Sequence, residues 1–328
     1  MSIPGQGIEA CVEVAPERWD AELRAAGVTD VYYSRGFVAA SAALAGAEPV
    51  LLRHADVFFA CLLRGDPVDV VTPYGYGGPV GEPRAEFAAA YERWCARRGV
   101  VSSFAVFHPL LRNAGPPFRC TPLAGTVAWD LGGDTDLLAG MHKHHRRLVR
   151  RAQRAGYDVE VEQRPAGLSD FVTIYDRTME RRDAAPFYFF PPAYWEALAG
   201  DVPLVRADVR ADGALIASAL GMGEPPWLHY HLGAAADAAR GTGASHLALY
   251  ELARWGRERG FTTFHLGGGV GGRADSLLQY KLRFSPHGLI ESAIGKAVHD
   301  EAAYLRLSGQ AAIDWDGYFP AYRLNRRA

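Results

Sequence analysis

Short runs of apolar residues, separated by polar connections, predict a β-hairpin in each half of the chain. In the first half the runs are 49–54 (Pro-Val-Leu-Leu-Arg-His) and 57–63 (Val-Phe-Phe-Ala-Cys-Leu-Leu). In the second half they are 202–207 and 214–220. Apolar runs of this length, bounded by turn residues, are typical of paired antiparallel strands.

Two helical segments extend this correspondence between the halves. Residues 86–99 and 244–260 both contain Arg-Trp, end in Arg-Gly and pass into an apolar run, so that Trp94 corresponds to Trp255. A glycine after a helical pattern commonly ends the helix, and self-similarity along a chain indicates an internal repeat. The expected fold class is α/β (α+β), with two tandem domains that each hold a mixed sheet flanked by helices.

The boundary between the domains is expected near residue 122, because residues 113–125 are rich in turn formers. The N-terminal domain is predicted to span residues 1–122 and the C-terminal domain residues 123–328. Of the 328 residues, 49% are hydrophobic, which is enough for substantial buried cores.

Charge and cysteine content exclude some classes of function. A formal net charge of −2 excludes a globally basic nucleic-acid binder, so any contact with RNA must depend on a local patch. The four cysteines lack paired metal-ligand spacing and are expected to be reduced thiols.

The N-terminus has no signal-peptide pattern and no apolar run is long enough to cross a bilayer. We therefore expect a cytoplasmic protein without membrane insertion.

A glycine-rich turn followed by a rare lysine is the most informative motif. Residues 261–272 read Phe-Thr-Thr-Phe-His-Leu-Gly-Gly-Gly-Val-Gly-Gly, and Lys281 follows on a predicted helix. Glycine permits positive φ and close approach of a ligand. Arginine is the usual cation of this chain, and the only lysines are Lys143, Lys281 and Lys296. A lysine kept at such a place suggests a site that needs a compact ammonium, although it can also be incidental.

The arrangement resembles the Fem-type aminoacyltransferases of the GNAT acyltransferase superfamily. In that family a strand leads to a glycine turn and a helix with an aromatic-Lys-x-x-Phe element, which here is Tyr280-Lys281-Leu-Arg-Phe284. The resemblance covers most of the chain. It implies two GNAT-like domains, with the acceptor on the N-terminal side and donor binding and catalysis on the C-terminal side. It also implies that Lys281 lies near the donor's terminal phosphate or the developing oxyanion, and that Gly267, Gly268 and Gly269 bind the donor.

A basic helix is predicted from about residue 136 to residue 155. Its expected core positions are Leu138, Met141, Leu148, Ala152 and Ala155, and its expected exposed positions are Lys143, Arg146, Arg147, Arg150, Arg151 and Arg154. No acidic residue interrupts this run of cations, which favours a phosphate-facing surface. Arg146, Arg147, Arg150 and Arg151 are accordingly predicted to bind the donor. The histidines of this segment lack zinc-ligand spacing, so no metal site is expected.

A second anion site is predicted at residues 239–245, Ala-Arg-Gly-Thr-Gly-Ala-Ser, which lead into the second Trp-containing helix. Backbone N–H groups at a helix N-terminus favour phosphate. The segment resembles the GNAT loop that holds coenzyme A, except at its final small residue. Arg240, Gly241 and Gly243 are the predicted donor-binding residues, and a plain turn with a helix cap is the alternative.

Three strand histidines are the candidate bases. His229 and His231 are expected on one face of a strand and Tyr230 on the other. By the GNAT resemblance the parallel neighbour carries His265, and the two strands splay apart around the acyl donor. A histidine there is suited to accept a proton from an amine, although strand histidines are more often satisfied core residues.

The resemblance also implies residues that contact the acceptor. Tyr74 and Tyr76 precede a Gly-Pro-Val segment like the one that lines the family's acceptor channel. Arg182, with Arg181 as its rival, belongs to a Thr-x-x-Arg-Asp-like helix. The predicted acceptor-binding residues are Tyr74, Tyr76, Arg182, Tyr194 and Tyr280.

These observations predict an amide-forming N-acyltransferase. The expected donor is aminoacyl-tRNA, bound through the local basic patch, and the expected acceptor is the amine of a small molecule, peptide or cell-envelope precursor. The donor is a co-substrate, so no cofactor is expected. The alternative donors are acyl-CoA and an acyl-carrier protein, and the other alternative is a non-catalytic RNA-binding or scaffold protein. The family's long charged helical hairpin has no counterpart in this sequence.

Overall fold

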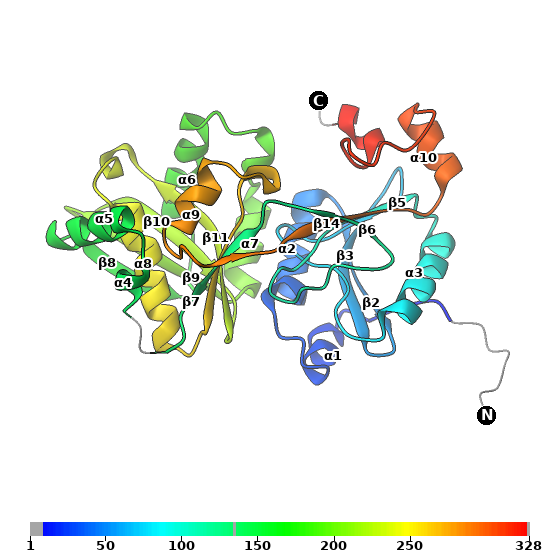
Figure 1. The fold of residues 1–328 in the computed structure, drawn as a ribbon, viewed down its shortest axis with the longest axis horizontal. Coiled ribbons are helices and arrows are strands. Elements are labelled where there is room, and N and C mark those ends of the chain that lie inside the picture. The colour runs from blue at the N-terminus through cyan, green and yellow to red at the C-terminus, as the bar shows by residue number, and fades with distance from the viewer. Residues whose placement is uncertain (1–8, 134–135, 327–328) are drawn as a thin grey trace. The chain divides into compact units, whose positions relative to one another are not determined.

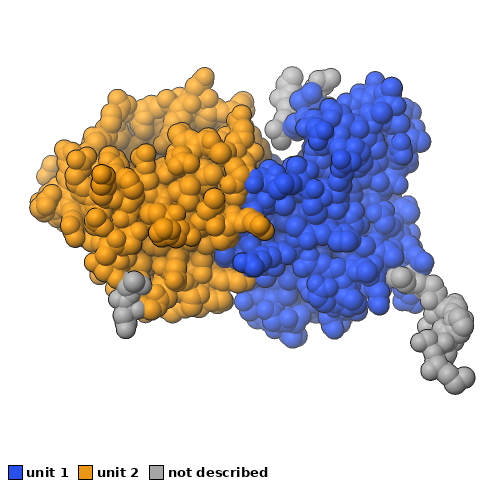
Figure 2. All heavy atoms as spheres, in the orientation of Figure 1, with its two compact units in different colours: residues 1–123, 292–328 blue, residues 124–291 orange. Residues whose placement is uncertain are grey.

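The computed structural model describes residues 9–133 and 136–326, and its chain forms two compact units. Unit 1 consists of Met1–Leu123 together with Ser292–Ala328, and unit 2 of Ala124–Glu291 (Figure 2). The tail beyond residue 291 therefore belongs to unit 1, whereas the predicted C-terminal domain extended to residue 328. The reason is that a strand after residue 291 is hydrogen-bonded into the sheet of unit 1.

The sheet of unit 1 has seven strands within the described part of the chain, in the order β1-β2-β3-β4-β5-β14-β6 (Figure 1). Their bounds are β1 (Val12–Glu13), β2 (Glu48–His54), β3 (Val57–Arg64), β4 (Asp69–Val71), β5 (Ser102–Val106), β14 (Ala293–Val298) and β6 (Arg119–Pro122). The helices are α1 (Trp19–Ala25), α2 (Arg35–Ala45), α3 (Arg84–Arg98) and α10 (Glu301–Ser308), with 3₁₀ turns at Val31–Tyr33 and Ala321–Arg326.

The core of unit 1 forms where α3 covers its sheet. Phe87, Tyr91 and Trp94 recur at helical spacing, are buried, and pack in one cluster with Phe59 of β3. The helix ends at Gly99, whose φ of +67° is the left-handed conformation that glycine adopts without strain.

Unit 2 repeats this plan, and its described strands run in the order β8-β9-β10-β11-β12-β7-β13. Their bounds are β8 (Asp158–Gln163), β9 (Leu204–Ala211), β10 (Ala214–Met222), β11 (Trp227–Ala235), β12 (Thr263–Gly267), β7 (Thr126–Asp130) and β13 (Leu289–Ile290). The helices are α4 (Leu137–Gly140), α5 (Lys143–Arg154), α6 (Ser169–Arg181), α7 (Pro192–Asp201), α8 (Ala244–Glu258) and α9 (Ser276–Leu282), with 3₁₀ turns at Pro186–Tyr188, Asp237–Ala239 and Val270–Gly272.

The two sheets correspond strand for strand. The predicted hairpins are β2–β3 and β9–β10, and the predicted Trp helices, α3 and α8, connect the parallel pairs β4–β5 and β11–β12. The sixth place in each sheet is filled by exchange. In unit 1 it is held by β14, which follows β13 of unit 2, and in unit 2 by β7, which follows β6 of unit 1. Both are antiparallel to the fifth strand of their sheet.

The predicted basic helix is interrupted. The extended backbone of Met141, with ψ 153°, separates α4 from α5, and the ring of His142 caps α5 by accepting the N–H of His144. His145, Val149 and Ala152 form the buried face of α5, so the expectation that Leu148 and Ala155 face the core is wrong. The actual stripe is set by i, i+4 and i+7 spacing from His145.

Among the described residues, none of the helices has both the length and the apolar character needed to cross a bilayer.

Gly295 tests the position of the exchanged strand β14. A Cβ at this residue would lie 2.6 Å from Cβ of Phe118 and 2.7 Å from the ring of Phe107. Overpacking of this kind costs about 1–3 kcal/mol, so Gly295→Ala is expected to lower the free energy of unfolding by that amount. Gly65→Ala, where nothing lies within 4 Å, is the matched control. Equal stability of the two variants in urea unfolding would contradict this packing.

Candidate functional site

The parallel strands β11 and β12 part shortly after they begin. In the described residues they pair at three positions, the last of which places His229 opposite His265. Each strand then contains a bulge, which leaves one residue extra relative to its antiparallel partner: His231 on β11 and Leu266 on β12. Beyond this point β11 continues to Ala235 paired with β10. The parallel pairing thus ends where the splay of the two strands was predicted, and bulges at such a place are a common device for redirecting strands at functional sites.

A pocket of about 420 Å³ lies in unit 2 where β11 ends and α8 begins. It is lined by Leu148, Arg181, Arg182, Ala235, Ala236, Asp237, Ala239, Arg240, Gly241, Gly243, Ser245, His246 and Tyr280. The predicted donor-binding residues Arg240, Gly241 and Gly243 are therefore gathered in one place with Arg182 and Tyr280, which were predicted on the acceptor side. The position of all five in one pocket favours a single ligand for both sets.

Gly243 brings the start of α8 against α5. Its φ is +91°, and a Cβ built on it would lie 2.3 Å from the carbonyl oxygen of Leu148. As the N-cap it offers no side-chain acceptor to the helix, and Thr242 Oγ1 accepts the N–H of Ala244 instead. A helix of 15 residues presents a positive dipole end at this rim of the pocket.

The two neighbouring arginines at the C-terminal end of α6, Arg181 and Arg182, have different contacts. Arg181 is held in place, because it donates to the carbonyl of Ala235, lies 3.4 Å from Asp237 and contacts Thr178. Arg182 has no ion-pair partner within the described residues. Burial raises the pKa of Tyr230 to about 12 and the positive charge of Arg182 partly opposes this rise. Arg182 therefore supplies uncompensated positive charge to the pocket.

His246 is a pocket residue that the sequence analysis missed. Its ring meets that of buried His145 edge to face, with 4.4 Å between centroids. Burial lowers the pKa of His145 to about 3 and that of His246 to about 4, and each is lowered further by a neighbouring histidine. Both rings are therefore neutral at pH 7. The sequence could have indicated His246 as a site residue, because it lies in the first turn of the helix after Gly243. Its contact with His145, 101 positions away, could not be predicted from the sequence.

Lys281 folds back onto the glycine turn. Its Nζ donates to the carbonyl of Gly268 at 2.7 Å and lies 5.8 Å from the ring centre of Tyr230. The side chain is buried, which lowers its pKa to about 8, while the charge of Asp275 partly opposes the fall. Asp275 also fixes the turn, since its carboxylate accepts the N–H groups of Val270 and Leu278.

The three predicted histidines lie in unit 2, where two of them contact each other and the third contacts a tyrosine. The rings of His229 and His265 are hydrogen-bonded through their Nδ1 atoms at 3.2 Å. His231 bonds the hydroxyl of Tyr194 at 2.9 Å, and burial, followed by the effect of His229, lowers the pKa of His231 to about 3. Tyr194 is fully buried, and the partner that the structure shows for its hydroxyl is His231. A contact of Tyr194 with the acceptor stays a prediction.

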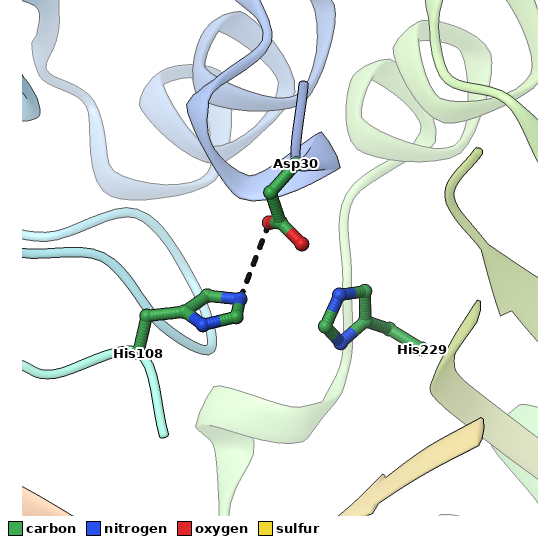
Figure 3. Close-up of side chains that lie close together, drawn as sticks. All are labelled: Asp30, His108 and His229. Atoms are coloured by element: carbon green, nitrogen blue, oxygen red, sulfur yellow. Dashed lines mark ion pairs between the residues drawn. The ribbon is translucent and has the colours of Figure 1, made fainter. Parts of the chain in front are cut away.

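In unit 1, Tyr74 and Tyr76 lie in the loop between β4 and α3. Tyr76 meets Tyr32 edge to face, with 5.3 Å between ring centroids, and lies beside His108. His108 is itself buried, and its Nε2 lies 3.3 Å from a carboxylate oxygen of Asp30, the contact drawn as a dashed line in Figure 3. Leu111 N–H donates to Nδ1 of His108, which leaves its proton on Nε2 toward Asp30. These contacts place Tyr76 in a polar aromatic cluster with Tyr32 and His108.

The exposed face of α5 carries most of the predicted cations. Lys143, Arg147, Arg150, Arg151 and Arg154 are exposed, whereas Arg146 is half-buried and donates to the carbonyl of Ala139 at 3.0 Å. We call these six residues the basic face of α5. Leu148 of the same helix lines the pocket.

Comparisons with known proteins agree with this geometry. Residues 139–282, which make up most of unit 2, match the family model described as an acetyltransferase (GNAT) domain. No curated protein sequence matches the chain. The family match confirms the predicted GNAT resemblance and supports an N-acyltransferase enzyme. The acyl donor of such an enzyme, acyl-CoA or aminoacyl-tRNA, is a substrate rather than a cofactor.

Several solved structures share the fold over most of the chain. The structure of FemX is 14% identical, with a TM-score of 0.64, and the match covers 90% of this chain and 99% of that one. L-PGS from Bacillus licheniformis is 18% identical, with a TM-score of 0.59 and coverage of 90% and 94%. A tandem GNAT protein from the clavulanic acid biosynthesis pathway is 13% identical, with a TM-score of 0.52 and coverage of 88% and 98%. These likenesses confirm the tandem GNAT-like fold.

The buried ammonium of Lys281 predicts a pH-dependent stability. Between the native pKa of about 8 and the ordinary value of 10.5, the unfolded chain binds more protons, so stability rises with pH over this window. The full effect is on the order of 3 kcal/mol, at about 1.4 kcal/mol for each unit of pKa. Lys281→Met is expected to lack this rise when urea unfolding is compared at pH 7.5 and pH 10. Parallel changes in the two proteins would contradict the burial of a charged Lys281.

Gly243 and Gly241 form a matched pair for testing the pocket rim. Both have positive φ, +91° and +72°, but a Cβ would meet the backbone of Leu148 only at Gly243, and nothing lies within 4 Å at Gly241. Gly241→Ala is expected to cost about 1 kcal/mol of stability from its backbone conformation. Gly243→Ala is expected to cost about 1–3 kcal/mol more from the clash. Thermal unfolding of both variants measures the difference, and equal losses would refute the close approach.

Proposed function

We propose that the protein is an amide-forming aminoacyltransferase that takes its amino acid from aminoacyl-tRNA. The observation that carries this proposal is that one helix, α5, both contributes to the GNAT-type pocket and carries the exposed basic face. Leu148 lines the pocket, and the neighbouring positions Arg147, Arg150 and Arg151 are exposed on the same helix. A pocket next to a row of cations suits a donor whose reactive end leads into a long phosphate backbone.

The pocket itself suits the terminal phosphate of such a donor. The N-terminus of α8 offers backbone N–H groups and the positive end of its dipole. Arg182 adds a cation without an ion-pair partner in the described residues, and Arg240, 81% exposed, extends the positive rim. His145 and His246 are neutral at pH 7, so the positive charge comes from arginine and from the helix, which stay positive over the working pH range.

In the proposed reaction a neutral amine attacks the ester carbonyl of the donor, which then expels the 3′-hydroxyl of the tRNA. Holding the two reactants together supplies much of the acceleration. Lys281 uses one of its three N–H groups on Gly268 and has two left to donate toward charge that develops on the carbonyl oxygen. The polar aromatic cluster of unit 1, which contains Tyr76, is the proposed acceptor side together with Tyr74 of the same loop.

The amine belongs to a small molecule, a peptide or a cell-envelope precursor, so the product is a biosynthetic amide. Use of charged tRNA places the proposed reaction in the cytoplasm. The second candidate is an acyltransferase that uses acyl-CoA, which the same helix N-terminus and Arg182 would also serve. The two candidates differ in whether the basic face of α5 takes part.

Donor binding distinguishes them. Bulk aminoacyl-tRNA and acetyl-CoA are the probes, and the variant replaces Arg146, Arg147, Arg150 and Arg151 by alanine together. The variant is expected to bind tRNA more weakly, because it neutralises fewer phosphates. For the variant, the slope of the logarithm of the tRNA binding constant against the logarithm of the salt concentration is expected to be flatter. The change is about one for each phosphate of duplex-like RNA that the variant no longer neutralises. Acetyl-CoA binding is expected to be absent or unchanged.

The control removes four exposed arginines of unit 1, Arg24, Arg35, Arg97 and Arg306, and is expected to leave tRNA binding and its slope within twofold of the wild type. An unchanged slope in the α5 variant would refute the tRNA donor. Micromolar acetyl-CoA binding that is lost in Arg182→Ala would favour the acyl-CoA candidate. Binding of tRNA without amide formation from any amine tested would favour a non-catalytic protein.

A further inference from the structure

Buried His145 of α5 has one ring nitrogen with a hydrogen-bond partner and one without. Its Nε2 lies 3.0 Å from the carbonyl oxygen of Tyr280, and a carbonyl oxygen only accepts, so this nitrogen carries the proton. The ring is neutral at pH 7, which makes Nδ1 a bare acceptor. Among the described residues no group donates to this Nδ1, although His145 is only 1% exposed. An acceptor buried without a partner is costly and asks for a reason.

His246 of α8 is placed to supply the missing donor. The helices α5 and α8 pack against each other (Figure 1), and the rings of His145 and His246 meet edge to face with 4.4 Å between centroids. An imidazole turns readily about its bond to Cβ, because this torsion is broad. Such a turn brings an N–H of His246 to Nδ1 of His145. A neutral imidazole has one N–H and one bare nitrogen, so the other nitrogen of His246 then becomes an acceptor.

This acceptor belongs to the pocket at the start of α8. The ring of His246 is half-buried, lines the pocket and lies 5.2 Å from the ring centre of Tyr280, which lines it too. Burial, and after it the neighbouring Tyr230, raise the pKa of Tyr280, and the positive charge of Arg182 partly opposes this rise. The charge of Arg182 therefore acts at the Tyr280 hydroxyl. The pocket has an aromatic side with an acceptor nitrogen and a cationic side.

This division of the pocket suits a nucleotide. A phosphate binds at the cation and at the helix N-terminus, and a planar base fits against aromatic rings. The volume of about 420 Å³ is in the range of small-ligand sites. An acceptor nitrogen in the wall selects a base that presents an amino group, as adenine does at its position 6. Both candidate donors contain an adenosine with a 5′-phosphate, since one ends the tRNA chain and another is part of coenzyme A.

We propose that His246, oriented by His145, reads the 6-amino group of a donor adenosine whose 5′-phosphate is held by Arg182. This inference rests on the proposed function and names the part of the donor that the pocket recognises. His246 touches the base, and His145 is a positioning residue that acts through it. In aminoacyl-tRNA the reactive ester is on the ribose of the same adenosine. Recognition of the base therefore also positions the ester near Lys281, which follows Tyr280 on α9.

Calorimetric titration of the full chain tests the reading of the base. The probes are AMP and purine riboside 5′-monophosphate, which lacks only the amino group. AMP is expected to bind about 3- to 10-fold more tightly, the effect of one neutral hydrogen bond. Adenosine without phosphate is expected to bind about tenfold more weakly than AMP, and Arg182→Ala to remove most of that difference. Failure of AMP to bind at millimolar concentration, or equal Kd values for the two monophosphates, would overturn the inference.

Two histidine variants connect this preference to His246. His246→Phe keeps an aromatic ring and removes both nitrogens, so it is expected to bring the two monophosphates to within about twofold of each other. The matched control is His287→Phe, at an exposed histidine of unit 2 outside the pocket lining, which is expected to keep the wild-type preference. Thermal unfolding shows whether each variant is folded. An unchanged preference for AMP in folded His246→Phe would refute the role of this ring.

Nuclear magnetic resonance of the wild type tests the role of His145 without a variant. The chain is labelled with ¹⁵N and ¹³C, and the ring nitrogens are assigned through their bonds to the backbone. Nδ1 of His145 is expected as the unprotonated nitrogen. Its ¹⁵N resonance is expected to move upfield at saturating AMP, because it gains a hydrogen bond from His246. A protonated Nδ1, or a resonance that AMP leaves in place, would overturn the orientation of His246 by His145.

The source of the adenosine is tested separately from its recognition. Bulk tRNA trimmed of its terminal adenosine is expected to bind about fivefold more weakly than intact tRNA at the same salt concentration, and acetyl-CoA is expected not to displace AMP. Equal binding of the two tRNAs, with displacement of AMP by acetyl-CoA, would refute the tRNA donor and leave the reading of adenine in place. Equal binding of the two monophosphates, with weaker binding of trimmed tRNA, would refute the reading of adenine and leave the tRNA donor in place.

Discussion

The site of unit 2 depends on one constraint: a parallel ladder that stops while one of its strands continues. Past His229 and His265, the backbone of β11 is bonded to β10 on one side and lacks β12 on the other. Backbone polar groups of this kind need other partners, and Arg181 and Thr178 supply them at Ala235. The same parting leaves room for the pocket at the end of β11 and for the glycine turn at the end of β12. The candidate site is therefore a consequence of interrupted pairing.

Burial sorts the ionisable groups of this region by what they are able to do. Histidine and lysine lose charge when buried, which makes His145, His231 and His246 neutral at pH 7 and brings the pKa of Lys281 to about 8. Arginine keeps its charge, and Arg182 and Arg240 provide it at the rim of the pocket. Arginines that stay charged and histidines that are neutral at pH 7 thus lie within the same unit.

Local patterns predicted what local physics controls. The hairpins, the Trp helices and the glycine turn were readable, because strand alternation, helical spacing and glycine conformations act over a few residues. The gathering of Arg182, Arg240 and Tyr280 in one pocket was not, since it depends on how α6, α8 and α9 pack. The break at Met141 was missed because helical spacing continues across it. The role of the tail was missed for a stronger reason: the strand pattern of β14 does not say which sheet it joins.

The exchange of β7 and β14 affects how the chain is able to fold as it is made. The sheet of unit 1 receives its sixth strand from Ala293–Val298, after the whole of unit 2 has been synthesised. Until then β5 and β6 lack the strand that lies between them, and their facing edges are unpaired. The sixth strand of unit 2 is available from the start, because β7 is synthesised before the other strands of its sheet. We therefore expect unit 2 to close first during synthesis, although unit 1 begins the chain, and the last strand to emerge completes the domain that started it.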